Sequence, residues 1–170
     1  MRRNGFSLVE LVVVIAVMVT LMAIGGLVYS KATRKTGMES EVKAMYADLM
    51  TARSQALYRK TCRYVTVAGT QFSVYTSSSC GATAPITGAI VQKTLKYGVT
   101  SSTTDSICFD WRGVANLVNS TNTDMSGTSK AICVQPSDPN LLTSVVVSST
   151  GIQMGRLTGG ACASGNITIQ

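Results

Sequence analysis

The sequence has 170 residues, of which 45% are hydrophobic and 14% charged, and its formal net charge is +7. This length suits one N-terminal anchor and one modest domain. The chain contains no histidine, which removes the usual general base, the Ser-His and Cys-His nucleophile pairs and the commonest metal ligand. The basic excess is compatible with anionic lipid, acidic proteins or nucleic acid and selects none of them.

The N-terminal stretch is apolar and carries one carboxylate. Nearly every residue from Phe6 to Val28 is apolar, and a helix of that length spans roughly 34 Å, enough to cross a bilayer. Glu10 within it costs about 2.5 to 3.5 kcal/mol on membrane-insertion scales. If the chain were cut after Gly5, the new amino group of Phe6 could pair with Glu10, most easily between staggered neighbouring helices. The pattern therefore predicts a self-assembling helix.

This pattern resembles the class III signal of type IV pilins and type II secretion pseudopilins, since Arg-Arg-Asn-Gly precedes Phe-Ser-Leu-Val-Glu. In that family a prepilin peptidase cuts after the glycine and methylates the new terminal residue. The resemblance implies that Gly5 is the cleavage-site glycine, Phe6 the N-methylated residue and Glu10 the acid that guides subunit assembly. An ordinary secretory signal has a shorter apolar region, and an ordinary single-pass anchor leaves Glu10 unexplained.

Four segments follow from this interpretation: a leader at residues 1–5, a transmembrane or filament-core helix at residues 6–29, an amphipathic half of the same helix at residues 30–60, and a periplasmic β-rich domain at residues 61–170. Arg2 and Arg3 would keep the leader in the cytoplasm, so the anchor would pass once through the bacterial inner membrane.

The second half of the helix has an apolar stripe. Its apolar residues recur at intervals of four and three, which predicts one face packed on the domain; they are Met38, Val42, Met45, Leu49, Ala52 and Ala56. Gly25, Gly26 and Gly37 are the expected weak points, because a helical glycine costs about 1 kcal/mol relative to alanine. Helix packing through small residues is the alternative for these glycines.

Beyond residue 60 the pattern alternates, which is typical of strands. Two runs separated by Ala-Gly-Thr, residues 63–67 and 71–75, predict a β-hairpin. Further strands are expected at residues 90–96, 106–110, 131–135, 144–148, 152–157 and 166–169, and exposed loops at residues 101–105 and 119–129. The predicted fold class is α+β, a long N-terminal helix packed on a C-terminal antiparallel β-sheet domain.

Three segments of this domain resemble the GspH/FimT group of minor pseudopilins. They are Asp-Leu-Met-Thr-Ala-Arg-Ser-Gln-Ala from Asp48, Ile-Cys-Phe-Asp-Trp-Arg-Gly from Ile107 and Val-Val-Val-Ser-Ser-Thr-Gly from Val145. The resemblance implies a structural, non-enzymatic subunit of the periplasmic filament of a type II secretion system. A FimT-like minor pilin, acting in type IV pilus biogenesis, motility or DNA uptake, is the alternative. The implied partners are other pilin or pseudopilin subunits, prepilin peptidase, the inner membrane and secreted cargo.

Five cysteines fit an exported domain in an oxidising space. Cys62 and Cys80 bracket the expected hairpin, and Cys108 and Cys133 lie in strands that could be neighbours, which would leave Cys162 over. The sequence does not fix this connectivity. Because no Cys-x-x-Cys occurs, disulfides are favoured over zinc, and we expect neither a metal site nor a cofactor.

Polar residues of the domain offer little chemistry. The acids after the helix show no EF-hand spacing and are interpreted as solvated loop residues; they are Asp105, Asp110, Asp124 and Asp138. Trp111 could stack on a ligand, but a cap on a small core is the preferred interpretation.

Gly155 and Arg156 resemble the start of the C-terminal Gly-Arg-x-Arg motif of some FimT proteins that act as DNA receptors. Thr158 stands where the second arginine belongs. Since phosphate binding needs several cations together, nucleic acid is a less favoured partner, with Arg156 as the candidate DNA or anion contact.

Overall fold

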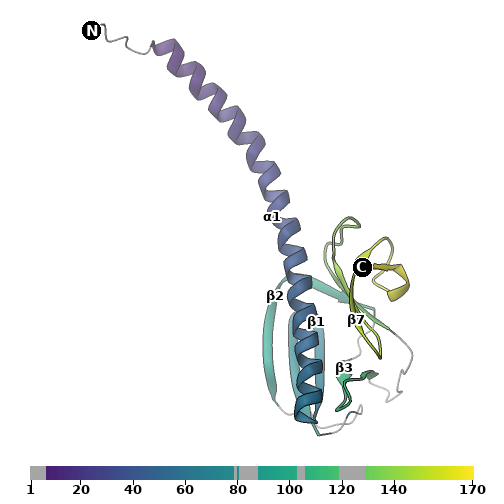
Figure 1. The fold of residues 1–170 in the computed structure, drawn as a ribbon. Helices are drawn as coiled ribbons and strands as arrows, with labels where there is room; N and C mark the ends of the chain where they lie inside the picture. Colours follow the sequence, from purple (N-terminus) through teal and green to yellow (C-terminus); the bar gives the residue numbers. More distant parts are fainter. Residues whose placement is uncertain (1–6, 79, 81–87, 103–105, 119–128) are drawn as a thin grey trace. The chain divides into compact units, whose positions relative to one another are not determined.

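The computed structural model describes residues 7–78, 80, 88–102, 106–118 and 129–170, apart from the side chains of residues 24–28. Within these residues, one α-helix precedes eight β-strands (Figure 1): α1 (Leu8–Arg59), β1 (Cys62–Ser77), β2 (Ala89–Ser101), β3 (Ser106–Phe109), β4 (Ala115–Val118), β5 (Lys130–Val134), β6 (Ser144–Val147), β7 (Ile152–Leu157) and β8 (Ile167–Ile169). A short 3-10 helix, Ser164–Asn166, leads into β8. The chain forms two compact units, Met1–Gly37 and Met38–Gln170. The boundary therefore falls within α1, at one of the expected weak points.

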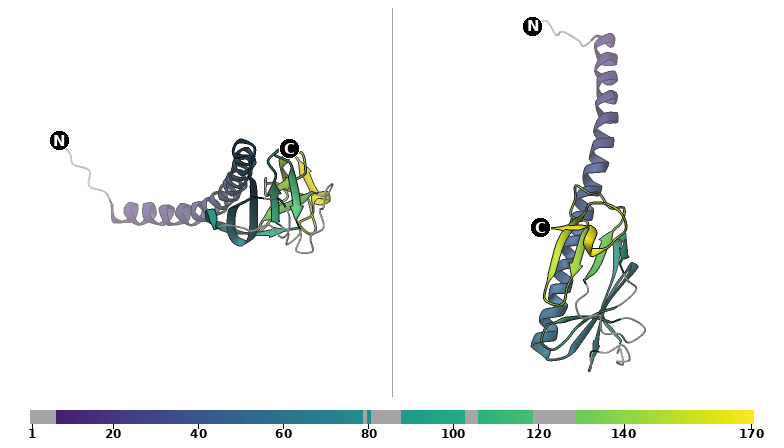
Figure 2. Two further views of the ribbon diagram at one scale, coloured as in Figure 1. Left: turned by 90° about the horizontal axis from the view of Figure 1, so that it is seen from below. Right: turned by 90° about the vertical axis from the view of Figure 1, so that its right-hand side faces the viewer.

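The strands form one antiparallel sheet in the order β4-β3-β1-β2-β5-β6-β7-β8. Figure 2 shows this sheet from two further sides. The long strand β1 has different neighbours at its two ends, because β3 pairs with residues 63–65 and β2 pairs with residues 69–75. The far end of β2 then pairs with β5. After β5, the strands pair in chain order: β5 with β6, β6 with β7 and β7 with β8. The predicted α+β fold class is confirmed.

The main core of the second unit lies between α1 and one face of this sheet. All six residues of the predicted helix stripe are buried, with no more than 4% of any of them exposed. They join a cluster with apolar residues of the strands, including Phe72, Ile107 and Val145. Alternate strand residues, such as Val146, face the other way and form smaller clusters, as the two-residue period of a strand requires.

The predicted hairpin at the start of the domain is wrong, because its two strands belong to the single strand β1. Val65, Val67, Phe72 and Val74 all contribute to the core on the α1 side. The odd spacing between Val67 and Phe72 cannot keep both on one face of a regular strand. The strand is irregular at this point, because the φ of Gly69 is 58° and the pairing with β2 shifts register between Gly69 and Gln71. The Ala-Gly-Thr signal thus marks an irregularity within one strand rather than a turn.

The six other predicted strands are present as β2, β3, β5, β6, β7 and β8. Five of them begin and end within one residue of the prediction, but β2 runs five residues further and includes Ser101, the first residue of the expected loop at residues 101–105. The strand β4 is absent from the prediction, although its alternating residues Ala115 and Leu117 are both buried. Most of the expected loop at residues 119–129, and residues 103–105 of the other, lie outside the described residues.

Candidate functional site

The described part of α1 in the first unit has a surface of exposed apolar side chains. Its large apolar side chains are between 43% and 79% exposed; they are Leu8, Val9, Leu11, Val12, Val13, Val14, Ile15, Val17, Met18, Val19, Leu21 and Met22. Soluble monomers rarely expose a continuous apolar surface of this extent, and such surfaces usually bind a membrane or another protein. This segment is therefore the candidate binding surface of the chain.

Glu10 lies in the first turn of α1, within this apolar surface. A carboxylate near a helix N-terminus is favoured by the positive end of the helix dipole. Gly5 and Phe6, the candidate cleavage and methylation positions, lie outside the described residues. No helix in the described part of the chain is long and apolar enough to cross a membrane. The expected transmembrane span stays a prediction.

In the second unit, Arg53 on α1 joins two turns of the sheet. Its Nε donates to the carbonyl oxygen of Gly113 at 2.8 Å, in the turn between β3 and β4. Its Nη2 donates to the carbonyl oxygen of Thr150 at 3.1 Å, in the turn between β6 and β7. These three residues come from the three segments that resemble the GspH/FimT group. Those segments therefore meet at one place in the fold.

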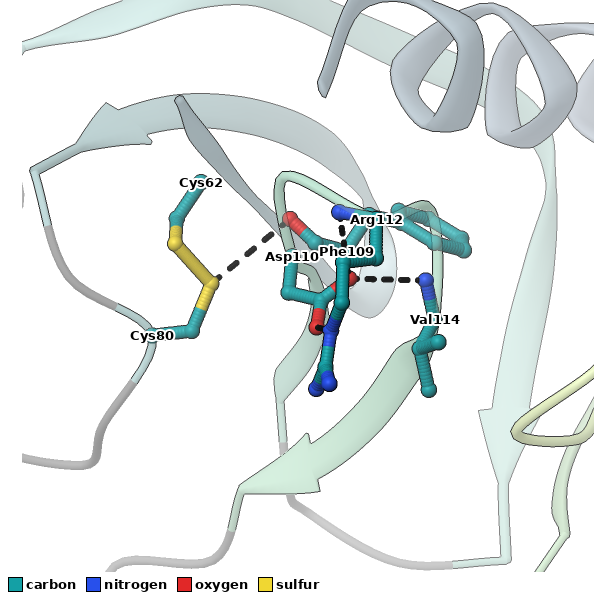
Figure 3. Close-up of a disulfide and its surroundings, with 6 residues drawn as sticks. All are labelled: Cys62, Cys80, Phe109, Asp110, Arg112 and Val114. Atoms are coloured by element: carbon teal, nitrogen blue, oxygen red, sulfur yellow. Dashed lines mark hydrogen bonds and ion pairs between the residues drawn. A yellow bond between two sulfur atoms is a disulfide. The ribbon is translucent and has the colours of Figure 1, made fainter. Parts of the chain in front are cut away.

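Asp110 organises the turn between β3 and β4 (Figure 3). Its Oδ1 accepts from the backbone N–H groups of Arg112 at 2.9 Å and Val114 at 2.8 Å, and its Oδ2 accepts from Nε of Arg112 at 2.9 Å. Burial raises the pKa of this carboxyl, but the hydrogen bonds from Val114 and Arg112 and the charge of Arg112 outweigh burial and hold the pKa below its usual value. The carboxylate is thus a structural part of the turn.

The other described loop acid has the same kind of role. The Oδ1 of Asp138 accepts from the backbone N–H of Asn140 at 2.9 Å, a common way for aspartate to stabilise a turn. Asp105 and Asp124 lie outside the described residues.

Trp111 does not cap the core, so that expectation is wrong. Its side chain is 53% exposed. The Nζ of Lys60 and the Cζ of Arg112 lie 5.8 Å and 5.6 Å from the centre of its ring, within the range of cation–π attraction. Two cations and an exposed aromatic ring therefore share one surface. From the sequence, ligand stacking and a core cap are the two interpretations of Trp111.

Arg156 lies on β7, partly buried and opposite Thr168 of β8. With the amide of Gln170 oriented to satisfy its neighbours, its oxygen accepts from Nη2 and Nε of Arg156 at 2.8 Å and 3.1 Å. Gly155 allows β8 to approach closely, since a Cβ there would lie 2.3 Å from Cγ2 of Ile167. Gly155 and Arg156 thus both help to fix the C-terminal strand β8 against β7.

The structure contains two disulfides, one between Cys62 and Cys80 and one between Cys133 and Cys162. The first is the pairing that the sequence suggests. The expected proximity of Cys108 and Cys133 is wrong, because β1 and β2 lie between β3 and β5 in the sheet. Cys108 instead keeps a buried thiol. Sequence spacing carries no signal for the pairing of Cys162, which depends on how the loop before β8 folds back.

Comparisons with known proteins identify the prokaryotic N-terminal methylation motif at residues 1–26. The fold is similar to two crystal structures of the type IV minor pilin FimU of Pseudomonas aeruginosa, strain PAO1. The structure in space group P21 has a TM-score of 0.55 and 13% identity over 77% of this chain and 97% of that chain. The structure in space group P65 has a TM-score of 0.51 and 14% identity over 73% and 97%. A comparison with curated protein sequences gives no significant match.

The comparisons thus show two features: an N-terminal methylation motif and a fold similar to that of a type IV minor pilin. At 13% and 14% identity, the particular likeness to FimU is one of fold: an N-terminal helix followed by an antiparallel sheet of eight strands.

Proposed function

We propose that this chain is a minor pilin-like subunit that prepilin peptidase cuts between Gly5 and Phe6, with Phe6 then methylated, and that assembles into a periplasmic filament. The observation that carries the proposal is the position of Glu10, in the first turn of a helix whose apolar side chains remain exposed as far as Met22. The methylation motif covers the same segment.

The assembly mechanism follows from two free-energy costs that association removes: exposed apolar side chains and unpaired charges in an apolar setting. In the membrane, lipid covers the exposed apolar side chains of the helix. In a filament, neighbouring apolar helices would cover them instead. The amino group of Phe6 and the carboxylate of Glu10 are both costly in an apolar setting, and each neutralises the other when they belong to neighbouring subunits. This pairing favours one stagger between helices, so it directs subunit order as well as affinity.

The leading system for this subunit is a type II secretion pseudopilus, with secreted cargo as a partner of the β-sheet domain. The three GspH/FimT-like segments that meet at Arg53 support this choice, since they act as one structural unit. The domain would lie in the periplasm and the apolar helix in the inner membrane before assembly. Two disulfides in the domain fit an oxidising compartment.

The second candidate is a minor subunit of a type IV pilus. The fold likeness to FimU, which is a type IV minor pilin, favours it. In this role the chain would act in pilus biogenesis, motility or DNA uptake. We propose a structural rather than an enzymatic role in either system.

A clean deletion, complemented by the wild-type gene, separates the two systems. Proteins released to the medium, twitching motility and transformation are measured in the same strain. Lost export with normal motility and DNA uptake supports the secretion pseudopilus, and intact export with lost motility or uptake supports the type IV pilus. Normal behaviour in all three assays, with the chain shown to be expressed in the parent strain, would contradict the proposed filament role.

A further inference from the structure

Three of the five cysteine sulfur atoms gather at one place. The Sγ atoms of Cys62, Cys80 and Cys108 all lie within 4.8 Å of one another. They come from β1, from the segment after β1 and from β3, so only the folded chain brings them together. Cys62 and Cys108 are 4% and 0% exposed, and Cys80 is partly buried.

The register of β1 and β3 shows whether Cys108 can form a disulfide with Cys62. Tyr64 is opposite Cys108 in the pairing of β1 with β3. Cys62 lies two residues before Tyr64 on β1, so it is the diagonal neighbour of Cys108. Diagonal Cα atoms of such strands are about 7–8 Å apart, whereas a disulfide usually needs about 4.4–6.8 Å. A bond between Cys62 and Cys108 would therefore need the strands to shift.

Metal coordination needs the disulfide to be reduced, because the Sγ atoms of Cys62 and Cys80 are bonded to each other in the structure. Three sulfurs that each lie about 2.3 Å from one metal ion are about 4 Å apart. The Sγ atoms of Cys62 and Cys80 would therefore separate on reduction, and the Sγ of Cys108 already lies within 4.8 Å of both. The surroundings also suit a metal, because Tyr64 and Tyr75 pack with the three cysteines in one cluster. An apolar shell of this kind limits access of water to the site.

We propose that the chain binds one soft metal ion through Cys62, Cys80 and Cys108 when the disulfide between Cys62 and Cys80 is reduced. Thiolates select Cu(I) and Zn²⁺, but structural Zn²⁺ sites almost always have four ligands. The three-sulfur site therefore matches Cu(I) best. This inference does not rest on the proposed filament role.

The reductant of the disulfide is a dithiol, such as the active site of a thiol-disulfide oxidoreductase. The dithiol gives two electrons and two protons to the disulfide of Cys62 and Cys80, which becomes two thiols, and the dithiol becomes a disulfide. Binding of Cu(I) then displaces thiol protons. Oxidation removes two of the three ligands, so disulfide formation and metal binding exclude each other. Cys108 is the residue that makes the difference between a plain disulfide and a redox-controlled metal site.

The test is a titration of the full-length chain with Cu(I), under anaerobic conditions, in competition with a coloured Cu(I) chelator. The chain is first reduced with a phosphine, and its fold is checked by circular dichroism. We expect one Cu(I) per chain, three sulfur neighbours by X-ray absorption, and no binding to the oxidised chain. The Cys108→Ala variant removes one ligand and leaves both disulfides possible, and its affinity should fall at least about tenfold.

The matched control is the double variant Cys133→Ala and Cys162→Ala, which removes the second disulfide and keeps all three proposed ligands. Its Cu(I) affinity should equal that of the wild type. Unchanged affinity in Cys108→Ala would overturn the proposal. Equal weakening in Cys108→Ala and in the control would also overturn it, because it would show binding to scattered thiols rather than to one folded site.

Discussion

The Nε of Arg53 donates a hydrogen bond of 2.8 Å to the carbonyl oxygen of Gly113, 60 residues further along the chain. The same guanidinium reaches the carbonyl oxygen of Thr150. One side chain of α1 therefore fixes the positions of two turns relative to the helix. Arginine suits this role, because its planar group presents several donors in a fixed geometry.

Replacement of Arg53 by alanine should destabilise the second unit by about 1.5–3 kcal/mol, because both carbonyl groups lose a charged donor. Replacement by lysine should recover only part of this loss, since one ammonium cannot reproduce both bonds. Urea unfolding of the full-length chain measures both changes. Lys43→Ala is the matched control, because Lys43 is an exposed cation of the same helix. Equal stability of Arg53→Ala and Lys43→Ala would contradict the structural role of Arg53.

The Asp110→Asn variant tests the turn between β3 and β4. At pH 7 it should lose about 1–3 kcal/mol, because the hydrogen bonds to the carboxylate are charge-assisted. The pKa of Asp110 is lowered in the folded chain. Its stabilising contribution is therefore complete above the unfolded pKa, about 3.9, and is lost as the pH falls through the lower folded value.

Urea unfolding as a function of pH measures this effect. The stability difference between wild type and Asp110→Asn should be constant above about pH 5 and shrink below about pH 4. Asp138→Asn gives a comparison in a second turn, where the carboxylate also accepts a backbone N–H, and shows how large the effect of a turn aspartate is there. A difference that persists undiminished at the acid end would show that Asp110 acts through shape rather than charge.

The Gly155→Ala variant tests the close contact between β7 and β8. The added Cβ would lie 2.3 Å from Cγ2 of Ile167 and 2.8 Å from the backbone oxygen of Thr168, so the strands must separate. We expect a loss of about 1–3 kcal/mol, typical of overpacking. Gly98→Ala is the control, because its Cβ would meet no atom within 4 Å. Hydrogen exchange should show the loss of protection in β8 first, and equal stability of the two variants would rule out the contact as a constraint.

The sequence predicts the helix and its packing face well because both follow from local spacing. Every residue of the stripe that begins at Met38 is buried, since a period of 3.6 residues leaves few alternatives. The irregularity at Gly69 is harder to predict, because a glycine between two alternating runs is also typical of a hairpin turn. Only the pairing of β3 with one end of β1 and β2 with the other distinguishes them, and this pairing is not local.

The functional residues divide in the same way. The proposed role of Glu10 is based on one charge in an apolar segment, which the sequence displays directly. The gathering of Cys62, Cys80 and Cys108 and the reach of Arg53 depend on strand order, with partners from distant segments. The order places β3 beside β1 and separates it from β5, and no spacing in the sequence encodes that choice.

Arg156 bears on the DNA-uptake alternative. Because Gln170 occupies its guanidinium and Thr158 replaces a second arginine, we expect Arg156→Ala to keep the wild-type affinity for DNA. A gel-shift series over salt concentration measures this. A fall of about one unit in the slope of log K against log salt for Arg156→Ala would show a phosphate contact and favour DNA uptake. Gln170→Ala, which releases the guanidinium, shows whether Gln170 masks such a contact.

Glu10→Ala tests the assembly mechanism most directly. The variant leaves the amino group of Phe6 without its partner in an apolar helix bundle, and loss of one member of a buried ion pair costs about 3–5 kcal/mol. That cost corresponds to more than about a hundredfold weaker subunit addition, so the variant should be cut normally and fail to enter filaments.

Cleavage is read from the mass of the mature chain, and incorporation from the amount in sheared filaments. Glu10→Gln, which keeps the size of the side chain and removes its charge, should behave like Glu10→Ala if charge pairing is the cause. Thr20→Ala is the control in the same segment, because the Thr20 hydroxyl donates to the carbonyl oxygen of Val17 in its own helix. Normal incorporation of Glu10→Ala would overturn the role of Glu10, and normal incorporation of Glu10→Gln alone would replace ion pairing with hydrogen bonding as the mechanism.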